Sequence, residues 1–287
     1  MASLKETKDR IASVKSTLKI TSAMKMVASA KLHKAQNAIE SMLPYETQLK
    51  AMLAQLAGCA GDRVGRYAKS VAAEGAPVLI VAFCSNSSLC GGFNANAIRE
   101  VRNRIEELRY TCPVEVLPIG KKMAEALKRD GLSFGSDNAS LLNHCSYEAV
   151  AGMAQRLTDD FLEGKYGRIE FIYNHFISTA TQKTVRSVFL PMEKAATAVD
   201  AEEPDEYIVE PSKEEMTDAL LPKVLRLSLY TVFLDTIAAE HAARTVAMQT
   251  ASDNAENILQ DLTLEYNKGR QQKITAEILD IVGGTMQ

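Results

Sequence analysis

Residues 4–42 read LKETKDRIASVKSTLKITSAMKMVASAKLHKAQNAIESM, and this stretch decides the fold. Counting from Leu4 in alternating steps of three and four residues gives positions that are mostly apolar, although only 46% of the whole chain is hydrophobic. This N-terminal seam consists of Leu4, Thr7, Ile11, Val14, Leu18, Thr21, Lys25, Ala28, Leu32, Ala35, Ile39, Met42, Glu46, Leu49, Leu53 and Leu56. An apolar repeat of this period, with no glycine before Gly58, is typical of a helix that supercoils around a partner helix. The sequence therefore predicts a coiled-coil helix over residues 1–58, which Pro44 kinks without ending.

A second apolar strip lies beside this seam on the same predicted helix. It consists of Ile20, Met24 and Val27, at positions where a two-stranded rod is normally polar. Two interpretations stay open, which are further packing within the chain and a contact surface for another protein. We favour the second, because the strip is too apolar for a free surface.

The C-terminal part of the chain repeats the pattern, with no proline from Lys223 to about Gly283. Its seam is Val224, Leu227, Thr231, Leu234, Ala238, His241, Thr245, Met248, Ser252, Ala255, Leu259, Leu262 and Tyr266. Pro222 suits the first turn of this helix, and we expect a separate short helix before it. Each end of the chain then forms a helix of roughly 80 to 90 Å, too long for a compact globule of this length. The two helices are expected to pair antiparallel, because the chain returns from a middle domain.

Composition excludes several function classes. The formal net charge of −3 lacks the basic surplus of a general nucleic-acid binder. Apolar runs of 18 residues are absent, so no membrane span is expected, and the N-terminus has no signal core. These features favour a cytosol-like compartment. The five cysteines show no CxxC spacing, so we expect reduced, mostly buried thiols.

The middle of the chain, over residues 75–195, alternates strands with helices. Strands are expected at 77–83, 114–118, 169–176 and 184–190, and helices at 95–108, 120–129 and 147–162. This order predicts a Rossmann-like α/β domain with a mostly parallel sheet and a hairpin at one edge. The acidic residues 199–210 are expected to form a linker, and residues 211–287 the C-terminal helical segment that pairs with 1–58.

The loop SNSSLCGGFN, residues 85–94, follows the first strand, where α/β sheets commonly bind ligands. It matches neither a phosphate loop, since no lysine follows its glycines, nor GxGxxG. Cys90 would need a histidine partner to act as a nucleophile, and the sequence places none beside it. We therefore expect a tight turn, and no catalytic, cofactor-binding or metal site anywhere in the chain.

Three stretches together resemble the gamma subunit of F-type ATP synthases along essentially the whole chain. They are ITSAMKMVASAK at 20–31, SLCGGFN at 88–94, and a C-terminal series with AARTVAM at 242–248, SDNA at 252–255, YNKGRQ at 266–271 and ITAEI at 274–278. The resemblance implies a central rotor shaft, a long antiparallel two-helix coiled coil with an α/β domain. The shaft transmits rotation between a membrane ring of c subunits and a catalytic head of alpha and beta subunits, and the chemistry takes place on beta.

The resemblance also implies contact residues, partners and a location. Contacts with the alpha/beta ring fall at Met24, Lys25, Arg270, Gln271, Thr275, Ile278 and Val282, and contacts with the c ring or the epsilon subunit fall at Tyr207 and Glu210. Ile274, Ile278, Ile281 and Val282 make an apolar tip that suits a hydrophobic bearing. The implied place is the cytoplasmic face of a bacterial plasma membrane, as a peripheral protein.

This sequence departs from the family at residues 86–88, where Asn86-Ser87-Ser88 stands in place of the usual Asp-Arg-Gly. It also lacks the inserted cysteine pair of the chloroplast form, so thiol switching is not expected. Two other functions stay open on the residues alone: a coiled-coil tether, and a small α/β enzyme with helical arms. The ratio of co-purified partners to this chain and any turnover by the isolated chain distinguish these functions from the shaft.

Overall fold

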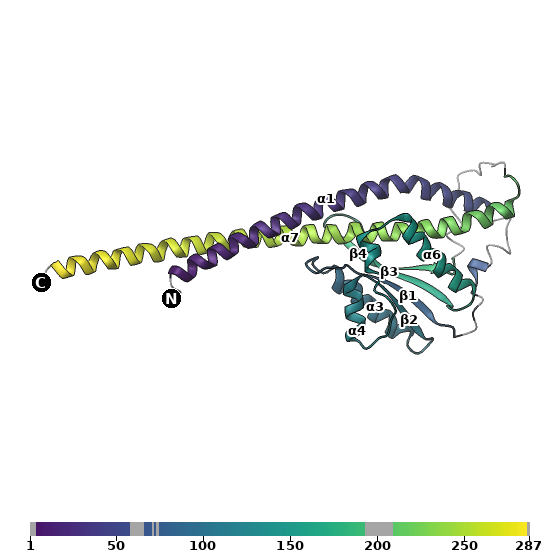
Figure 1. The fold of residues 1–287 in the computed structure, drawn as a ribbon, viewed down its shortest axis with the longest axis horizontal. Helices are drawn as coiled ribbons and strands as arrows, with labels where there is room; N and C mark the ends of the chain where they lie inside the picture. Colours follow the sequence, from purple (N-terminus) through teal and green to yellow (C-terminus); the bar gives the residue numbers. More distant parts are fainter. Residues whose placement is uncertain (1–3, 58–65, 71, 73–74, 193–208, 286–287) are drawn as a thin grey trace. The chain divides into compact units, whose positions relative to one another are not determined.

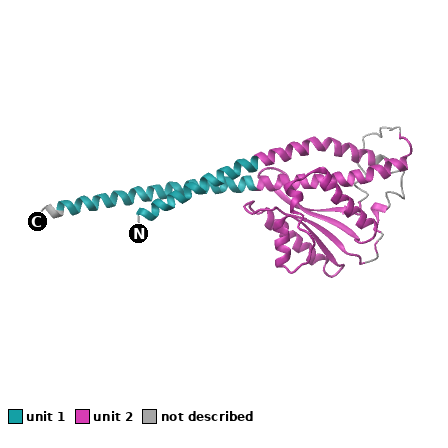
Figure 2. Cartoon of the chain, in the orientation of Figure 1, with its two compact units in different colours: residues 1–29, 244–287 teal, residues 30–243 magenta. Residues whose placement is uncertain are grey.

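The computed structural model describes residues 4–57, 66–70, 72, 75–192 and 209–285. Its contacts divide the chain into two compact units, which Figure 2 colours differently. Unit 1 combines residues 1–29 with residues 244–287, and unit 2 is residues 30–243. The domains expected from the sequence, at 1–58, 75–195 and 211–287, follow sequence segments instead and stay a prediction. Among the described residues, no helix carries an apolar stretch long enough to cross a bilayer.

Two long helices come from the two ends of the chain, as the sequence predicts. Helix α1 spans Leu4–Ala57 and helix α7 spans Lys213–Thr285 (Figure 1). The helix α1 continues through Pro44, which confirms that this proline does not end it.

The expectation that a separate short helix precedes Pro222 is wrong, because Pro222 lies inside α7. The helix begins earlier, where the Ser212 hydroxyl accepts a hydrogen bond from the Glu215 N–H at 3.2 Å. Ser212 and Glu215 have the spacing of a capping box, a start signal that our reading of the sequence missed. Around the proline, Leu220, Leu221 and Val224 of α7 are buried against α1, and this packing offsets the lost backbone bond.

The predicted N-terminal seam is confirmed within each unit. Every position of that seam is buried or half-buried, from Leu4 in unit 1 to Leu56 in unit 2. The C-terminal seam behaves in the same way from Val224 to Tyr266. Period alone therefore located the contact face of both helices.

The sheet in unit 2 has four strands in the order β2-β1-β3-β4. The strands are β1 (Val78–Phe83), β2 (Val114–Ile119), β3 (Arg168–Phe176) and β4 (Gln182–Leu190). Strand β1 is parallel to β2 and to β3, whereas β3 and β4 are antiparallel. This confirms a mostly parallel sheet with a hairpin at one edge.

Helices cover both faces of this sheet in unit 2 (Figure 1). They are α3 (Phe93–Leu108), α4 (Lys121–Arg129), the short α5 (Ala139–Asn143), which the sequence did not indicate, α6 (Tyr147–Leu162) and the first part of α7. Leu79, Val81 and Phe83 of β1 share a core with α6 and α7, while Val78, Ile80 and Ala82 face α3 and α4. Burial on both faces explains why β1 is an uninterrupted apolar run.

Four alanines of α7 lie between two neighbours in unit 2. Ala238 and Ala242 pack against Leu32 and Ala35 of α1. Ala239 and Ala243 pack against Cys90 and Phe93, at the loop that follows β1. Small side chains on both faces of α7 let both neighbours approach closely.

Candidate functional site

The C-terminal part of α7 is uncovered in unit 1. Leu4, at the start of α1, approaches Gly269 so closely that a Cβ added there would lie 3.2 Å from its Cδ2 atom. All of residues 270–282 are exposed, and Figure 2 shows α7 continuing past the N-terminal end of α1. The predicted contact residues Arg270, Gln271, Thr275, Ile278 and Val282 fall in this stretch.

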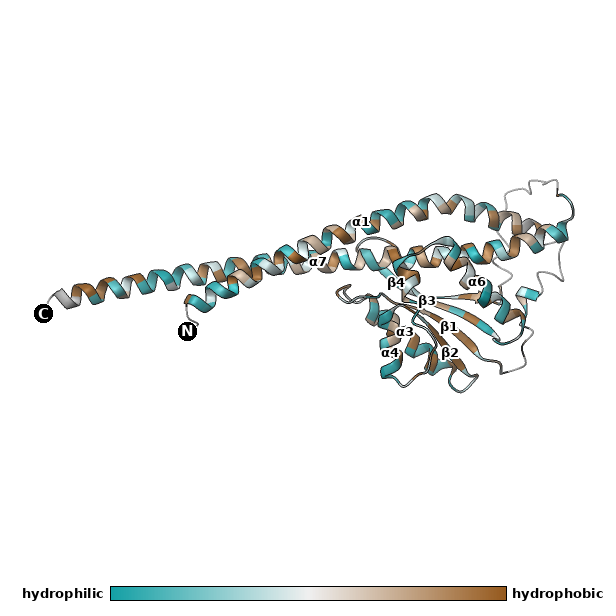
Figure 3. Cartoon of the chain, in the orientation of Figure 1, coloured by the Kyte–Doolittle hydropathy of each residue, from teal (hydrophilic) through white to brown (hydrophobic). Residues whose placement is uncertain are grey.

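Five large apolar side chains on this stretch face solvent. They are Ile274, Ile278, Leu279, Ile281 and Val282, and their exposed fractions range from 46% to 67%. Apolar turns recur towards this end of α7 in Figure 3. Contiguous apolar surface of this kind marks an interaction site, and a lone helical end of this length is only marginally stable in water. We call residues 270–282 the α7 tip.

The strip on α1 is also uncovered, in part. Ile20 and Val27 are 59% and 57% exposed, while Met24 is half-buried. Met26, which was not placed in the strip, is 65% exposed beside it. The chain therefore does not bury this strip by its own packing, which favours the contact-surface interpretation. Ile20, Met24 and Val27 form the α1 strip.

Lys25 is held against α7 within unit 1. Its ammonium group donates a hydrogen bond to Gln249 Oε1 at 2.7 Å, and Gln249 Nε2 donates to Asp253 Oδ1 at 2.6 Å. Lys25 occupies a seam position, so its aliphatic stem packs while its charge stays at the edge. Lys25 therefore lies beside Met24 of the α1 strip and is tied to α7.

The polar positions of the two seams meet each other. In unit 1, the Thr21 and Ser252 hydroxyl oxygens lie 2.8 Å apart and both residues are buried. In unit 2, Thr231 donates to Glu46 Oε2 at 2.9 Å, and Lys50 also pairs with Glu46. Buried polar pairs in an apolar seam fix the register of the two helices, because a shift would leave each group unsatisfied.

The predicted c-ring and epsilon contacts are less defined. Tyr207 lies outside the described residues. Glu210 is exposed just before α7 begins. Glu210 belongs to unit 2, whereas the α7 tip belongs to unit 1.

The loop of residues 85–94 is a turn braced by hydrogen bonds. Asn94 Nδ2 donates to Ser85 Oγ at 2.8 Å, and its Oδ1 accepts the Ser85 N–H at 2.9 Å. Asn86 donates to the Ala139 carbonyl and to Asn143 Oδ1, each at 2.8 Å. The Asn86 amide thereby ties the loop to α5.

Nucleophilic chemistry at this loop has no support from its surroundings. Cys90 is 1% exposed, and the polar groups bonded to it come from Ser85, Ser87 and Asn94. Burial raises the pKa of the neighbouring Cys84 thiol far above its ordinary value, so Cys84 stays protonated. Within the described ranges, no group of three or more His, Cys, Asp or Glu side chains could hold a metal ion.

A cluster of ion pairs lies where α3 meets β3 and β4. Arg104 donates two hydrogen bonds to the buried carboxylate of Glu170, at 2.6 and 2.8 Å, and Arg168 lies 2.7 Å from the same group. Hydrogen bonds from Arg186 and Arg104 lower the pKa of Glu107 to about 2. Each charge is paired, so the cluster is a structural tie between α3 and the sheet.

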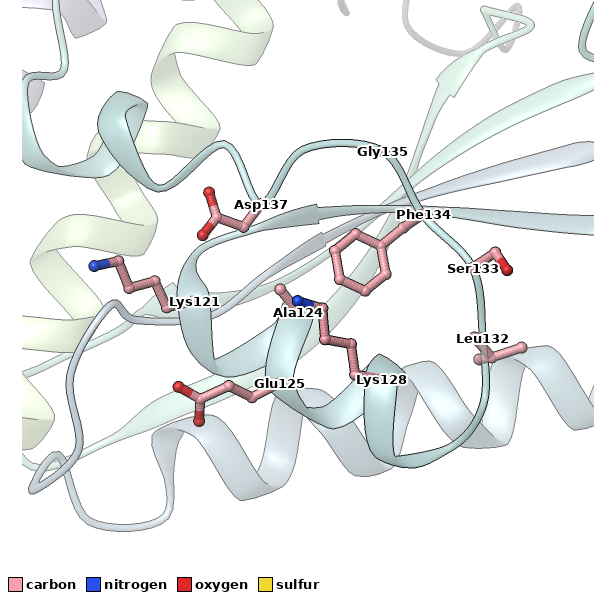
Figure 4. Close-up of a pocket in the computed structure, with 9 residues that line it drawn as sticks. All are labelled: Lys121, Ala124, Glu125, Lys128, Leu132, Ser133, Phe134, Gly135 and Asp137. Carbon is pink, nitrogen blue, oxygen red and sulfur yellow. The ribbon is translucent and has the colours of Figure 1, made fainter.

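A cavity of about 500 Å³ lies beside α4, lined by residues 121–137 (Figure 4). The Phe134 ring lies beside Lys128, whose ammonium group is 5.8 Å from the ring centre. Lys121, Glu125 and Asp137 give the rim charges of both signs. The Asp137 carboxylate accepts the Ala139 N–H and Glu125 pairs with Lys122, so these acids have structural partners.

Sequence reasoning did not single out a buried acid on α7. Asp235 of α7 accepts the Phe176 N–H at 2.8 Å, and its other oxygen lies 2.6 Å from His175 Nδ1. Burial raises the pKa of Asp235, and the bonds to His175 and Phe176 act in the opposite direction. A single acid inside the apolar run of residues 232–239 was the signal available.

Comparison with known proteins gives consistent matches over the full length. A family model described as ATP synthase matches residues 3–286. The chain is 50% identical to the ATP synthase gamma chain of Phocaeicola vulgatus, with 100% of each chain covered. It is 48% identical to the ATP synthase gamma chain of Bacteroides thetaiotaomicron, again with 100% of each covered.

Solved structures share the fold. The central stalk and c-ring structure of the Tetrahymena thermophila mitochondrial ATP synthase includes a chain 25% identical to this one, with a TM-score of 0.57. That match covers 81% of this chain and 99% of the other. A chain of the Euglena gracilis mitochondrial ATP synthase gives a TM-score of 0.64 at 18% identity, covering 99% and 93%. The second match supports the fold alone.

Proposed function

The chain belongs to the ATP synthase gamma chain family, and from that premise we propose which of its surfaces meet the other subunits. It is the central rotor shaft of a bacterial F-type ATP synthase and is itself non-catalytic. Its partners are the alpha and beta subunits of the catalytic head, the epsilon subunit and the c-subunit ring. It works as a peripheral protein on the cytoplasmic face of the bacterial plasma membrane.

The α7 tip meets the alpha/beta ring. Arg270, Gln271 and Thr275 contact a loop of beta, and Ile278 and Val282 turn within an apolar sleeve of the ring. The observation that carries this proposal is the continuous exposure of residues 270–282. An apolar sleeve suits a turning helix, because dispersion and hydrophobic contact are not directional, whereas hydrogen bonds must break at each angle.

The α1 strip is the opposite contact surface with the ring. Met24 lies within it between the exposed Ile20 and Val27, and Lys25 lies next to it. The bond from Lys25 to Gln249 ties this surface to α7, so both helices present their contacts as one body within unit 1.

Tyr207 and Glu210 face the c ring or epsilon in this proposal. The support is the exposure of Glu210 and the position of both residues just ahead of α7. A carboxylate there suits polar loops at the surface of a membrane ring.

Purification of the complex through a tag on this chain tests the function. The shaft function requires alpha and beta in threefold excess over this chain, and no ATP turnover by the chain alone. A one-to-one partner would favour the tether, and intrinsic turnover would favour an enzyme. Either result would contradict the shaft.

Charge reversal at the alpha/beta surface tests the contact residues separately. Arg270→Glu should lower coupled ATP synthesis. Lys268→Glu, two positions earlier, makes the same charge change and is the control, so it should leave synthesis unchanged. Equal activity of both variants would exclude Arg270 as a contact, without affecting the shaft function.

A further inference from the structure

The loop of residues 85–94 has no part in the contacts proposed above, yet it presses directly on α7. Cys90 and Phe93 are buried together with Ala239 and Ala243, and Phe176 at the end of β3 packs on the same group. Ala239 is fully buried. The methyl side chains of α7 let the loop and the end of β3 lie close to the helix.

A buried carboxylate also fixes the orientation of the helix and the strand at this contact. Asp235 lies one helical turn before Ala239, and its two oxygens engage Phe176 N–H and His175 Nδ1 from the same end of β3. Apolar contact resists separation but permits sliding and rotation. Two hydrogen bonds to one carboxylate fix both the distance and the angle between helix and strand, because they weaken steeply when misaligned.

The loop is also tied into the rest of the sheet. Asn174, buried in β3, donates to the Phe93 carbonyl at 3.0 Å, and Thr184 of β4 donates to Asn174 Oδ1 at 2.6 Å. Within the loop, Asn94 Oδ1 accepts the N–H of Ser85, which lies two residues after the end of β1. Force on any of these strands therefore reaches the loop through short, satisfied bonds.

The contact lies at one end of unit 2 on α7. Earlier residues of the helix, including Phe233, are part of the core of the sheet. Ala243 is the last α7 residue in unit 2. A clamp at this place holds the helix angle where the sheet ends its contact with α7.

We propose that this contact is a torque joint that passes turning force from the α/β domain to α7, and that Asp235 is its positioning residue. The joint consists of Cys90, Phe93, His175, Phe176, Asp235, Ala239 and Ala243. The inference rests on the shaft function, since a static subunit would have no turning force to pass. It assigns a mechanical role to the loop motif of residues 85–94, which carries no chemistry.

Angular fluctuation of the assembled motor tests the joint. The head is immobilised, a probe is attached to the α/β domain, and the spread of probe angles is recorded without nucleotide. Asp235→Ala should widen the angular variance about twofold, because two hydrogen bonds to a buried carboxylate are lost. Thr236→Val is the matched control, since Thr236 is equally buried on the neighbouring position but bonds only to Val232 of its own helix.

The outcomes separate the joint from general stability and from the shaft function. The joint is supported if Asp235→Ala widens the angular variance and Thr236→Val does not, provided that the two variants lose similar thermal stability. Normal variance in Asp235→Ala overturns it. If that variant does not assemble, His175→Ala decides, because this half-exposed ring can be removed from the surface side: a smaller widening is expected, and no widening overturns the joint. Absence of the unmodified chain from the motor would instead overturn the shaft function.

Discussion

Two stretches of α7 are both helical and both carry large apolar side chains, but they differ in how exposed those side chains are. In residues 213–243, large apolar side chains such as Phe233 are buried in the core of unit 2. In residues 270–282 of unit 1, side chains of the same kind are exposed. The chain itself covers the first stretch, whereas under the proposed function the alpha/beta ring covers the second. Apolar side chains on one helix can therefore be buried in the core or exposed on the surface. The sequence alone does not distinguish the two cases.

The largest expected effect comes from truncating one side chain in each stretch. Phe233→Ala should lower the free energy of unfolding by about 3 to 5 kcal/mol, because it removes a ring packed at 5.1 Å from Phe83. Leu279→Ala at the α7 tip should change it by no more than about 0.5 kcal/mol. Denaturant unfolding of the isolated chain measures both. Similar losses in the two variants would break the comparison, because the tip would then have a partner within the chain.

A second prediction concerns the tip inside the motor. Ile278→Asp combined with Val282→Asp should abolish or strongly reduce proton-driven ATP synthesis, because burying a carboxylate in an apolar sleeve costs several kcal/mol. Unfolding of the isolated double variant should stay near that of the parent. Undiminished synthesis would count against an apolar bearing.

Register supplies a third prediction. Thr21→Ala should destabilise the helical pair by about 1 to 2 kcal/mol, because it leaves the buried Ser252 hydroxyl without its 2.8 Å partner. Adding Ser252→Ala should recover part of that loss. The double-mutant cycle gives the coupling energy directly, and additive effects would mean that the two hydroxyls do not interact.

The smallest effect is expected from acid titration of unit 2. The native pKa of Glu107, about 2, lies below its ordinary value of 4.5. The pairing with Arg186 and Arg104 is therefore fully present above pH 4.5 and is lost as the pH falls towards 2. Urea midpoints over this range should fall less steeply in Glu107→Gln than in the parent. Parallel pH profiles would show that the exposed pairing does not contribute.

Sequence patterns predicted the two long helices, their seams and a mostly parallel sheet with a hairpin at one edge, because paired helices repeat near 3.5 residues and buried strands are short apolar runs. It failed at Pro222, where a capping box at Ser212 and packing of Leu221 outweigh the penalty for an internal proline. The short helix α5 lacks a periodic signal of its own and was missed for that reason.

The contact residues of the α7 tip were predicted by resemblance, and its apolar composition by reading the residues. Its exposure required coordinates, since nothing in ITAEILDIV distinguishes a covered helix from an uncovered one. The partner of Asp235 was also beyond the sequence, because His175 and Phe176 are separated from it by about sixty positions and meet it only through the fold.

The four alanines at 238, 239, 242 and 243 have a consequence for the helix between its two neighbours. Alanine has the highest intrinsic helix propensity, and its side chain has no rotamer to lose when a neighbour presses on it. This turn of α7 therefore keeps its helical backbone by its own preference while α1 and the loop at Cys90 lie against it from different sides. Longer side chains would have to change rotamer as load shifted from one side to the other, and a helix built from them would yield where this one stays stiff.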